Sequence, residues 1–101
     1  MAEFHTVRRV TVYAEMAMEP MLTRTLMDMG ARGYTVTQGR GMGKHETLED
    51  PFSNVNRVRI ELIVQPPIAE QILQWIASPM FSRRAVAACM ETVEVVKSEE
   101  F

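Results

Sequence analysis

The residues best suited to chemistry lie in a glycine-rich segment that begins at Gly39. Gly39, Gly41 and Gly43 occupy alternate positions, and all five glycines of the chain fall between residues 30 and 43. Alternate glycines let backbone N–H groups approach an anion closely, and Arg40 and Lys44 add positive charge. No strand-to-helix context follows, as a dinucleotide-binding turn or P-loop would require. The spacing alone therefore leaves two interpretations open, an anion site and an inert loop.

A second candidate is the basic turn Ser82-Arg83-Arg84. A solvated turn is the ordinary interpretation of two adjacent arginines between a helix and a strand. The turn gains a functional meaning only if it meets the glycine segment, and the expected topology allows that meeting across a subunit boundary. Arginine suits two-point contact with a phosphate.

Catalysis and metal binding find little support in the residue types. No pair of carboxylates and no Ser/His/Asp set can be assembled, so we expect no enzymatic activity. His45 has no second histidine or cysteine at zinc-ligand spacing, and no metal site is expected. A copper site made of Met16, Met18 and His5 is the less favoured alternative.

Composition narrows the class of protein. The 101 residues, 47% hydrophobic and 24% charged, are expected to form one domain spanning 1–101. The formal charge of −2 gives no strong field for nucleic acid, and no apolar run is long enough to span a bilayer. The single Cys89 excludes an internal disulfide, and its apolar neighbours predict a buried side chain. A cytoplasmic protein is the simplest expectation.

Hydrophobic periodicity predicts six elements. Alternation indicates strands over 6–14, 34–38, 56–64 and 85–96, and Pro20 and Pro66 open two helices with apolar stripes. The phase of the last strand slips between Met90 and Val93, which predicts a bulge or a break. Within the third strand, Glu61 alternates with arginines and is expected to form an ion pair. The stretch 39–55 reads as a loop, and its length is typical of a functional segment.

The element order β-α-β-β-α-β predicts an α+β, ferredoxin-like fold, with two helices on one face of an antiparallel sheet. The other face of the sheet must be solvated or covered by a partner chain. Its expected side chains form a mixture that suits partial burial in an oligomer: Thr11, Tyr13, Thr35, Thr37, Arg59 and Ile63.

Two segments resemble the PII signalling superfamily. GYTVTQGRGMGK, residues 33–44, resembles the stretch that opens the mobile T-loop of that family, and RVRIELIVQP, residues 57–66, resembles its third strand. The resemblance implies a PII-like homotrimer with a nucleotide in each of three clefts between subunits. One wall of a cleft is the base of the T-loop, here about 39–55, and the other is the B-loop before the last strand.

Carried over by position, the resemblance assigns the candidate ligand residues. Thr35 and Ile63 would meet the base or ribose. Gly41, Gly43 and Lys44 would meet the phosphates. The expected nucleotide-binding set is Thr35, Gly39, Arg40, Gly41, Gly43, Lys44, Ile63, Phe81, Ser82, Arg83 and Arg84. The expected bicarbonate-binding set is Arg40, Gly41 and Lys44.

The sequence departs from the family at two places. Ser78-Pro-Met-Phe-Ser-Arg-Arg-Ala replaces the usual T-G-x-I-G-D-G-K B-loop, and the basic R-x-R segment near the C-terminus is missing. Because both supply triphosphate ligands, tight ATP binding of the usual kind is not expected. The remaining pattern resembles the branch that contains the bicarbonate-transporter-associated and carboxysome-associated PII-like proteins. That branch implies binding of ADP or AMP more than ATP, bicarbonate as a second ligand, and a transporter or carboxysome protein as partner.

Two other classes compete with this interpretation. A ligand-free, CutA-like trimeric interaction module is favoured by the missing B-loop glycines. A small acylphosphatase-like hydrolase shares the topology, but it would need an arginine-bearing phosphate loop after the first strand. The segment Glu15-Met-Ala-Met-Glu is acidic there, so this class fits poorly.

Overall fold

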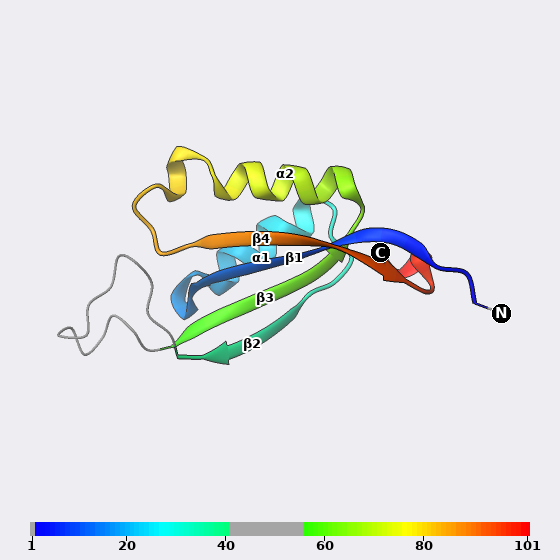
Figure 1. Ribbon diagram of the computed structural model, residues 1–101. Coiled ribbons are helices and arrows are strands. Elements are labelled where there is room, and N and C mark those ends of the chain that lie inside the picture. The colour runs from blue at the N-terminus through cyan, green and yellow to red at the C-terminus, as the bar shows by residue number, and fades with distance from the viewer. Residues whose placement is uncertain (1, 41–55) are drawn as a thin grey trace.

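The computed structural model describes residues 2–40 and 56–101, and it has the predicted element order (Figure 1). The elements are β1 (His5–Glu15), α1 (Glu19–Asp28), β2 (Thr35–Gly39), β3 (Arg57–Val64), α2 (Pro66–Ile76) and β4 (Ala87–Val95). The described residues also contain three short 3-10 turns: η1 (Met16–Met18), η2 (Pro79–Phe81) and η3 (Ser98–Glu100).

The strands form one antiparallel sheet in the order β2-β3-β1-β4. This is the ferredoxin-like arrangement predicted from the sequence. The central strand β1 pairs with both β3 and β4, and Thr11 faces Glu61 on one side and Cys89 on the other. The topology thus brings together segments that are far apart in the chain.

Both helices cover the same face of the sheet, and the core lies between these two layers (Figure 1). Alternate residues of β1 and β3 point into the core, together with the apolar stripes of α1 and α2. The residues with the least exposed surface there are Val10, Val12, Ala14, Leu22, Leu26, Ile60, Ala69 and Ile72. This layer fixes which side chains remain on the opposite, open face.

The ends of the helices follow from their sequences. Pro66 and Pro67 open α2, where the missing N–H of a proline costs no helical hydrogen bond. After α1 the chain turns at Gly30, whose φ of +116° is one that residues with a side chain rarely adopt. Gly30 therefore lets the chain leave α1 toward β2.

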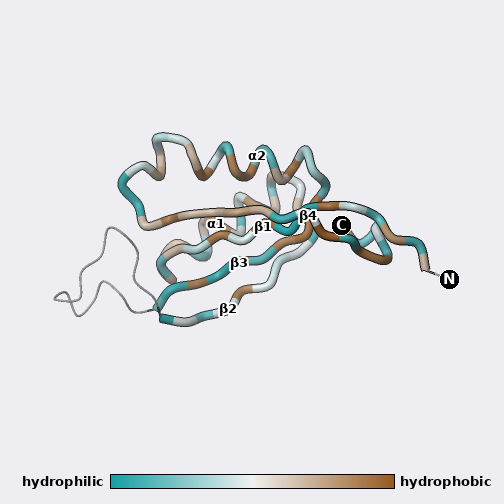
Figure 2. The backbone as a smooth tube through the Cα atoms, in the orientation of Figure 1, coloured by the Kyte–Doolittle hydropathy of each residue, from teal (hydrophilic) through white to brown (hydrophobic). Residues whose placement is uncertain are grey.

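The predicted irregularity of β4 is wrong. Every residue from Ala87 to Val95 has one partner in β1, in unbroken register. The apolar residues change face because the covering layer changes: Ala88 and Met90 lie on the helix face, whereas Val93 and Val95 lie on the open face. At that end the β1–β4 ribbon extends past the helices (Figure 1). The hydropathy of β4, apolar in its first half, follows the same change (Figure 2).

The open face of the sheet carries the predicted residues. Tyr13 is exposed there, whereas Thr11 is buried. Cys89 also lies on this face and is exposed in the single chain, so the predicted burial of its side chain is wrong. The apolar run around Cys89 does not mark burial, because β4 is an edge strand and its open face is uncovered at Cys89. Within 2–40 and 56–101, neither helix has the length and hydropathy to cross a membrane.

Candidate functional site

The candidate site lies along the β2–β3 edge of the open face. Because antiparallel partners share a face, Thr35 lies beside Glu61, Thr37 beside Arg59 and Gly39 beside Arg57. We call this set, with Ile63, the β2–β3 strip: Thr35, Thr37, Gly39, Arg57, Arg59, Glu61 and Ile63. It is a row of polar and charged groups with an apolar residue at one end.

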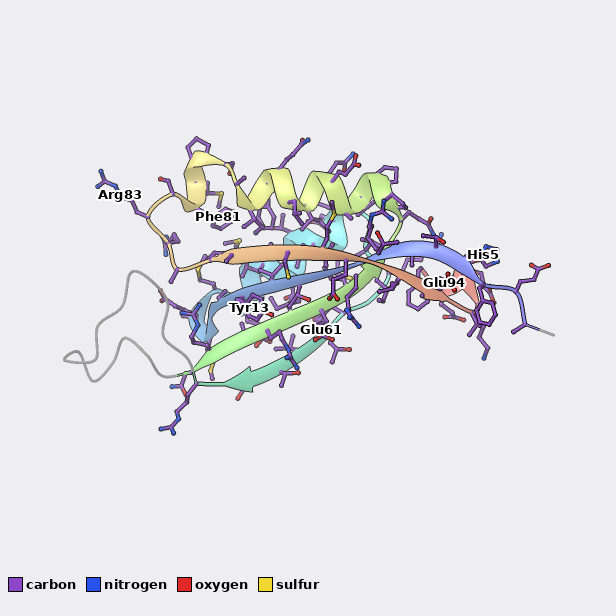
Figure 3. The ribbon with its side chains drawn as sticks, viewed as in Figure 1. His5, Tyr13, Glu61, Phe81, Arg83 and Glu94 are labelled. Atoms are coloured by element: carbon purple, nitrogen blue, oxygen red, sulfur yellow. The ribbon has the colours of Figure 1, made fainter. Side chains whose placement is uncertain are left out.

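A hollow of about 280 Å³ lies at the Gly39 end of the strip. We call it the Gly39 hollow. Its lining comes from β1, β2, β3 and the residue after β2: Tyr13, Thr37, Gln38, Gly39, Arg40, Arg57, Val58 and Arg59. Tyr13 contributes an exposed ring on the open face (Figure 3). The hollow combines an aromatic surface, a hydroxyl group and guanidinium groups.

The charges of the Gly39 hollow suit an anion. Arg40, Arg57 and Arg59 line it, and no carboxylate does among the described residues. Arg59 Nε lies 3.2 Å from the Glu61 carboxylate, the ion pair predicted from the sequence. Because that pair is partly exposed, it holds the Arg59 side chain along the strip without removing its attraction for a second anion.

Arg57 also joins the strip to the segment before β4. Its Nη2 donates a hydrogen bond to the Ala85 carbonyl oxygen at 3.3 Å. Ala85 directly follows the basic turn 82–84, and Arg57 is among the first residues after the glycine loop. This hydrogen bond connects the start of β3 with the residue that follows the basic turn within a single chain.

A second hollow of about 200 Å³ lies at the other end of the strip. We call it the Thr35 hollow. Its lining is Arg32, Gly33, Tyr34, Thr35, Glu61, Leu62, Ile63, Glu100 and Phe101. Thr35 and Gly39 are four residues apart, so the two hollows are separated by about 13 Å at 3.3 Å per strand residue. An extended nucleoside diphosphate can span that separation.

The structure divides the predicted ligand residues into two groups. Gly39 and Arg40 line the Gly39 hollow, whereas Thr35 and Ile63 line the Thr35 hollow. The ligand contacts expected of these residues stay predictions. Gly41, Gly43 and Lys44 lie outside the described residues.

The predicted residues before β4 are placed differently. Phe81 is 4% exposed and packs edge-on against Trp75, with ring centroids 5.0 Å apart, so its side chain is part of the core. Ser82, Arg83 and Arg84 are exposed, and Arg83 points away from the sheet (Figure 3). Within one chain, the turn 82–84 lines neither hollow.

The described residues contain no group of three or more His, Cys, Asp and Glu side chains that could hold a metal ion. The copper alternative fails on distance. His5 begins β1 and Met16 follows its last residue, so the two are about 36 Å apart along an extended strand.

Sequence reasoning missed six lining residues of the Gly39 hollow as ligand candidates: Tyr13, Thr37, Gln38, Arg57, Val58 and Arg59. The signal was present in part, since Tyr13, Thr37 and Arg59 were expected on the open face. Their approach to Gly39 depends on the register of three strands, and periodicity does not define that register.

Comparison with known proteins agrees with this fold. The profile of the family described as Nitrogen regulatory protein P-II matches residues 7–100. The chain belongs to the PII family. No curated protein matches the chain significantly.

Solved structures of PII-like proteins cover the whole fold. A protein of Thermus thermophilus, assigned to PII-like signalling, is 32% identical, with a TM-score of 0.81 and 98% of each chain covered. CPII of Thiomonas intermedia, bound to ADP, AMP and bicarbonate, is 18% identical with a TM-score of 0.84, covering 100% of this chain and 98% of its own. A second CPII structure, bound to ADP and bicarbonate, is 19% identical with a TM-score of 0.83. The match covers 100% of this chain and 99% of the CPII chain. At that identity the CPII structures show the fold alone.

Proposed function

We propose that this PII-family protein is a non-enzymatic sensor of adenine nucleotides and bicarbonate. It folds as one domain and assembles as a homotrimer, and each cleft between subunits binds ADP or AMP. Its cytoplasmic role is linked to inorganic carbon uptake or to carboxysome metabolism, through a transporter or carboxysome protein that recognises the liganded state. The CPII structures with ADP, AMP and bicarbonate bound support this choice of ligands.

The observation that carries the proposal is the polarity of the β2–β3 strip. Three arginines and no described carboxylate line the Gly39 hollow, whereas Ile63 and Tyr34 give the Thr35 hollow an apolar part. A nucleotide has the same polarity, with charged phosphates at one end and an aromatic base at the other. The strip therefore fits phosphates at Gly39 and the base at Thr35.

The size of the hollows supports a site completed by a second subunit. Pockets that enclose a small ligand measure about 300–1,000 Å³. The Gly39 hollow, at about 280 Å³, and the Thr35 hollow, at about 200 Å³, each fall below that range in one chain. We place the second wall on the neighbouring subunit, where Ser82, Arg83 and Arg84 point outward and can reach phosphate across the boundary.

Bicarbonate is assigned to the same end of the strip. The proposed bicarbonate set is Arg40, Gly41 and Lys44. Of these, Arg40 is a described residue, and it lines the Gly39 hollow. A planar anion of this size suits two-point contact with a guanidinium group. With bicarbonate bound beside the phosphates, the same site would respond to carbon supply through bicarbonate and to energy state through the nucleotide.

Calorimetric titration with ADP tests the assignment through a matched pair of variants. Arg40→Ala should weaken ADP binding by about 1–3 kcal/mol, the usual cost of losing a charged hydrogen bond. Arg24→Ala removes the same charge from an exposed position of α1, away from the strip, and should bind ADP as the wild type does. Equal affinities in the two variants would remove Arg40 from the site.

The competing function is a trimeric interaction module that binds protein and no small ligand. The absent B-loop glycines favour it. The two functions differ in the wild-type titration, because an interaction module gives no heat with any nucleotide.

A further inference from the structure

The last five residues form a turn that folds back on the chain. Lys97 adopts the left-handed conformation, with φ of 57° and ψ of 54°, which reverses the direction of the backbone after β4. The turn then closes with two backbone hydrogen bonds, from Glu100 N to Lys97 O and from Phe101 N to Ser98 O, each 3.0 Å. We call residues 97–101 the C-terminal turn.

Two side chains hold the C-terminal turn against the sheet. Arg32 Nη1 donates to the Glu99 carbonyl oxygen at 2.8 Å, and Gln65 Nε2 donates to the Phe101 carbonyl oxygen at 3.5 Å. Arg32 lies in the connection before β2, and Gln65 lies between β3 and α2. The turn therefore lies at the end of the sheet where β2 begins and β3 ends (Figure 1).

This docking makes the turn part of the Thr35 hollow. Glu100 and Phe101 line that hollow together with Thr35 and Ile63. Phe101 is half-buried. A large aromatic side chain thus borders the hollow in which the proposed function places the base.

We propose that Phe101 is a base-contacting residue of the nucleotide site, and that Arg32 is a positioning residue that holds it there. The inference rests on the proposed function and adds a wall that neither the glycine segment nor β3 supplies. Aromatic side chains bind nucleobases by stacking, and that contact does not depend on the phosphates.

The turn is a wall of the hollow and does not fill it. With the turn docked, the Thr35 hollow still measures about 200 Å³. A protein cavity of about 150 Å³ accommodates benzene, so an aromatic ring can enter beside Phe101. Displacement of the turn is not needed for binding.

The charges around the turn also favour a base over a phosphate at this end. Glu61 and Glu100 line the Thr35 hollow beside a single described cation, Arg32, whose guanidinium donates to the Glu99 carbonyl oxygen, so carboxylates outnumber cations there and disfavour an anion. Carboxylate oxygens accept hydrogen bonds, so they can meet the exocyclic amine of a purine. The base and the phosphates are thereby directed to opposite ends of the strip.

The test uses Phe101→Ala in the full chain, with ADP and inorganic pyrophosphate as separate calorimetric probes. Loss of stacking should weaken ADP binding by at least about fivefold, the lower limit expected for one base–aromatic contact. Pyrophosphate has no base, so its affinity should be unchanged. Phe101→Tyr keeps the ring and should bind ADP like the wild type. Met80→Ala, which removes an exposed apolar side chain of η2 outside the lining of this hollow, is the matched control.

A double-mutant cycle tests the role of Arg32. If Arg32 acts by holding the turn, Arg32→Ala should weaken ADP binding, and adding it to Phe101→Ala should cause little further loss. Additive losses would show that Arg32 acts independently of Phe101 and would overturn the positioning role.

The outcomes separate this inference from the function on which it rests. Wild-type affinity for ADP in Phe101→Ala, or tighter binding in it, would overturn the inference and leave the nucleotide site intact. Parallel losses of ADP and pyrophosphate binding would also overturn it, because they would indicate a general disturbance. A wild-type protein that binds no nucleotide would overturn the proposed function and this inference together.

Discussion

At the scale of single residues, Gly30 shows most directly how one position shapes the fold. Its φ is +116°, and a Cβ added there would lie 3.0 Å from Ile68 Cδ1 in α2. We expect Gly30→Ala to lower the free energy of unfolding by about 1–3 kcal/mol, the cost of holding a side-chain-bearing residue in such a conformation. Urea denaturation at a fixed subunit concentration measures the change.

Gly33→Ala is the control for that experiment. No heavy atom lies within 4 Å of the added Cβ, and its φ is outside the left-handed region. Replacing glycine where the backbone permits alanine changes stability by between zero and about +1 kcal/mol. A Gly33→Ala loss as large as that of Gly30→Ala would show that the backbone conformation at Gly30 is not the cause.

The sequence alone identified only some of the residues that belong to the candidate site. Gly39 and Arg40 were found because glycine spacing and charge are visible along the chain, and Glu61 was expected to pair with an arginine. Tyr13 could not be assigned as a ligand candidate, because it is 26 residues from Gly39 in the sequence. It joins the Gly39 hollow only through the pairing of β1 with β3 and of β3 with β2.

At the scale of elements, η2 anchors the segment that leads into β4. Phe81 is its buried residue and packs against Trp75 of α2. Phe81→Ala should lower the free energy of unfolding by about 3–5 kcal/mol, the usual cost of truncating a buried phenylalanine. Chemical denaturation measures this change at one subunit concentration.

Met80→Ala provides the comparison within the same turn. Met80 is 60% exposed, so its truncation should change the unfolding free energy by less than about 0.5 kcal/mol. If Phe81→Ala were equally mild, Phe81 would not be a core residue, and its predicted role as a ligand residue would regain support.

Hydrophobic periodicity predicted the elements that have one face covered along their whole length. It gave a wrong prediction for β4, where the covered face changes along the strand. β3 alternates between buried and exposed or half-buried residues along its length, so its pattern identifies both the strand and its inner face. β4 lies at the sheet edge, and its apolar residues pass from the helix face to the open face without a bulge. A phase slip in sequence therefore has two physical causes, an inserted residue or a change in what covers the strand.

At the scale of the whole molecule, the open face is where the proposed trimer must form. Cys89 provides a probe, because it is the only cysteine and is exposed on that face in the single chain. Burial against neighbouring subunits should slow its reaction with a thiol reagent at least tenfold relative to the urea-unfolded chain. A native rate equal to the unfolded rate would show that neighbouring subunits do not cover this part of the face.

The arrangement of the β2–β3 strip suggests how ligand binding could affect the whole molecule. One end of each strip lies beside the glycine segment, and the other lies against the C-terminal turn of the same chain. A ligand that spans both ends contacts elements from β1 to the C-terminal turn, so its binding can alter the surface offered to a partner.

Calorimetric titration of the wild-type protein with AMP, ADP and ATP, each with and without bicarbonate, tests the central claim most directly. The account predicts one site per subunit, tighter binding of ADP or AMP than of ATP, and a change in nucleotide affinity when bicarbonate is present. Absence of heat with every nucleotide at two temperatures would contradict it. The assignment of the PII fold would stand, and the function as a protein interaction module without a small ligand would then be favoured.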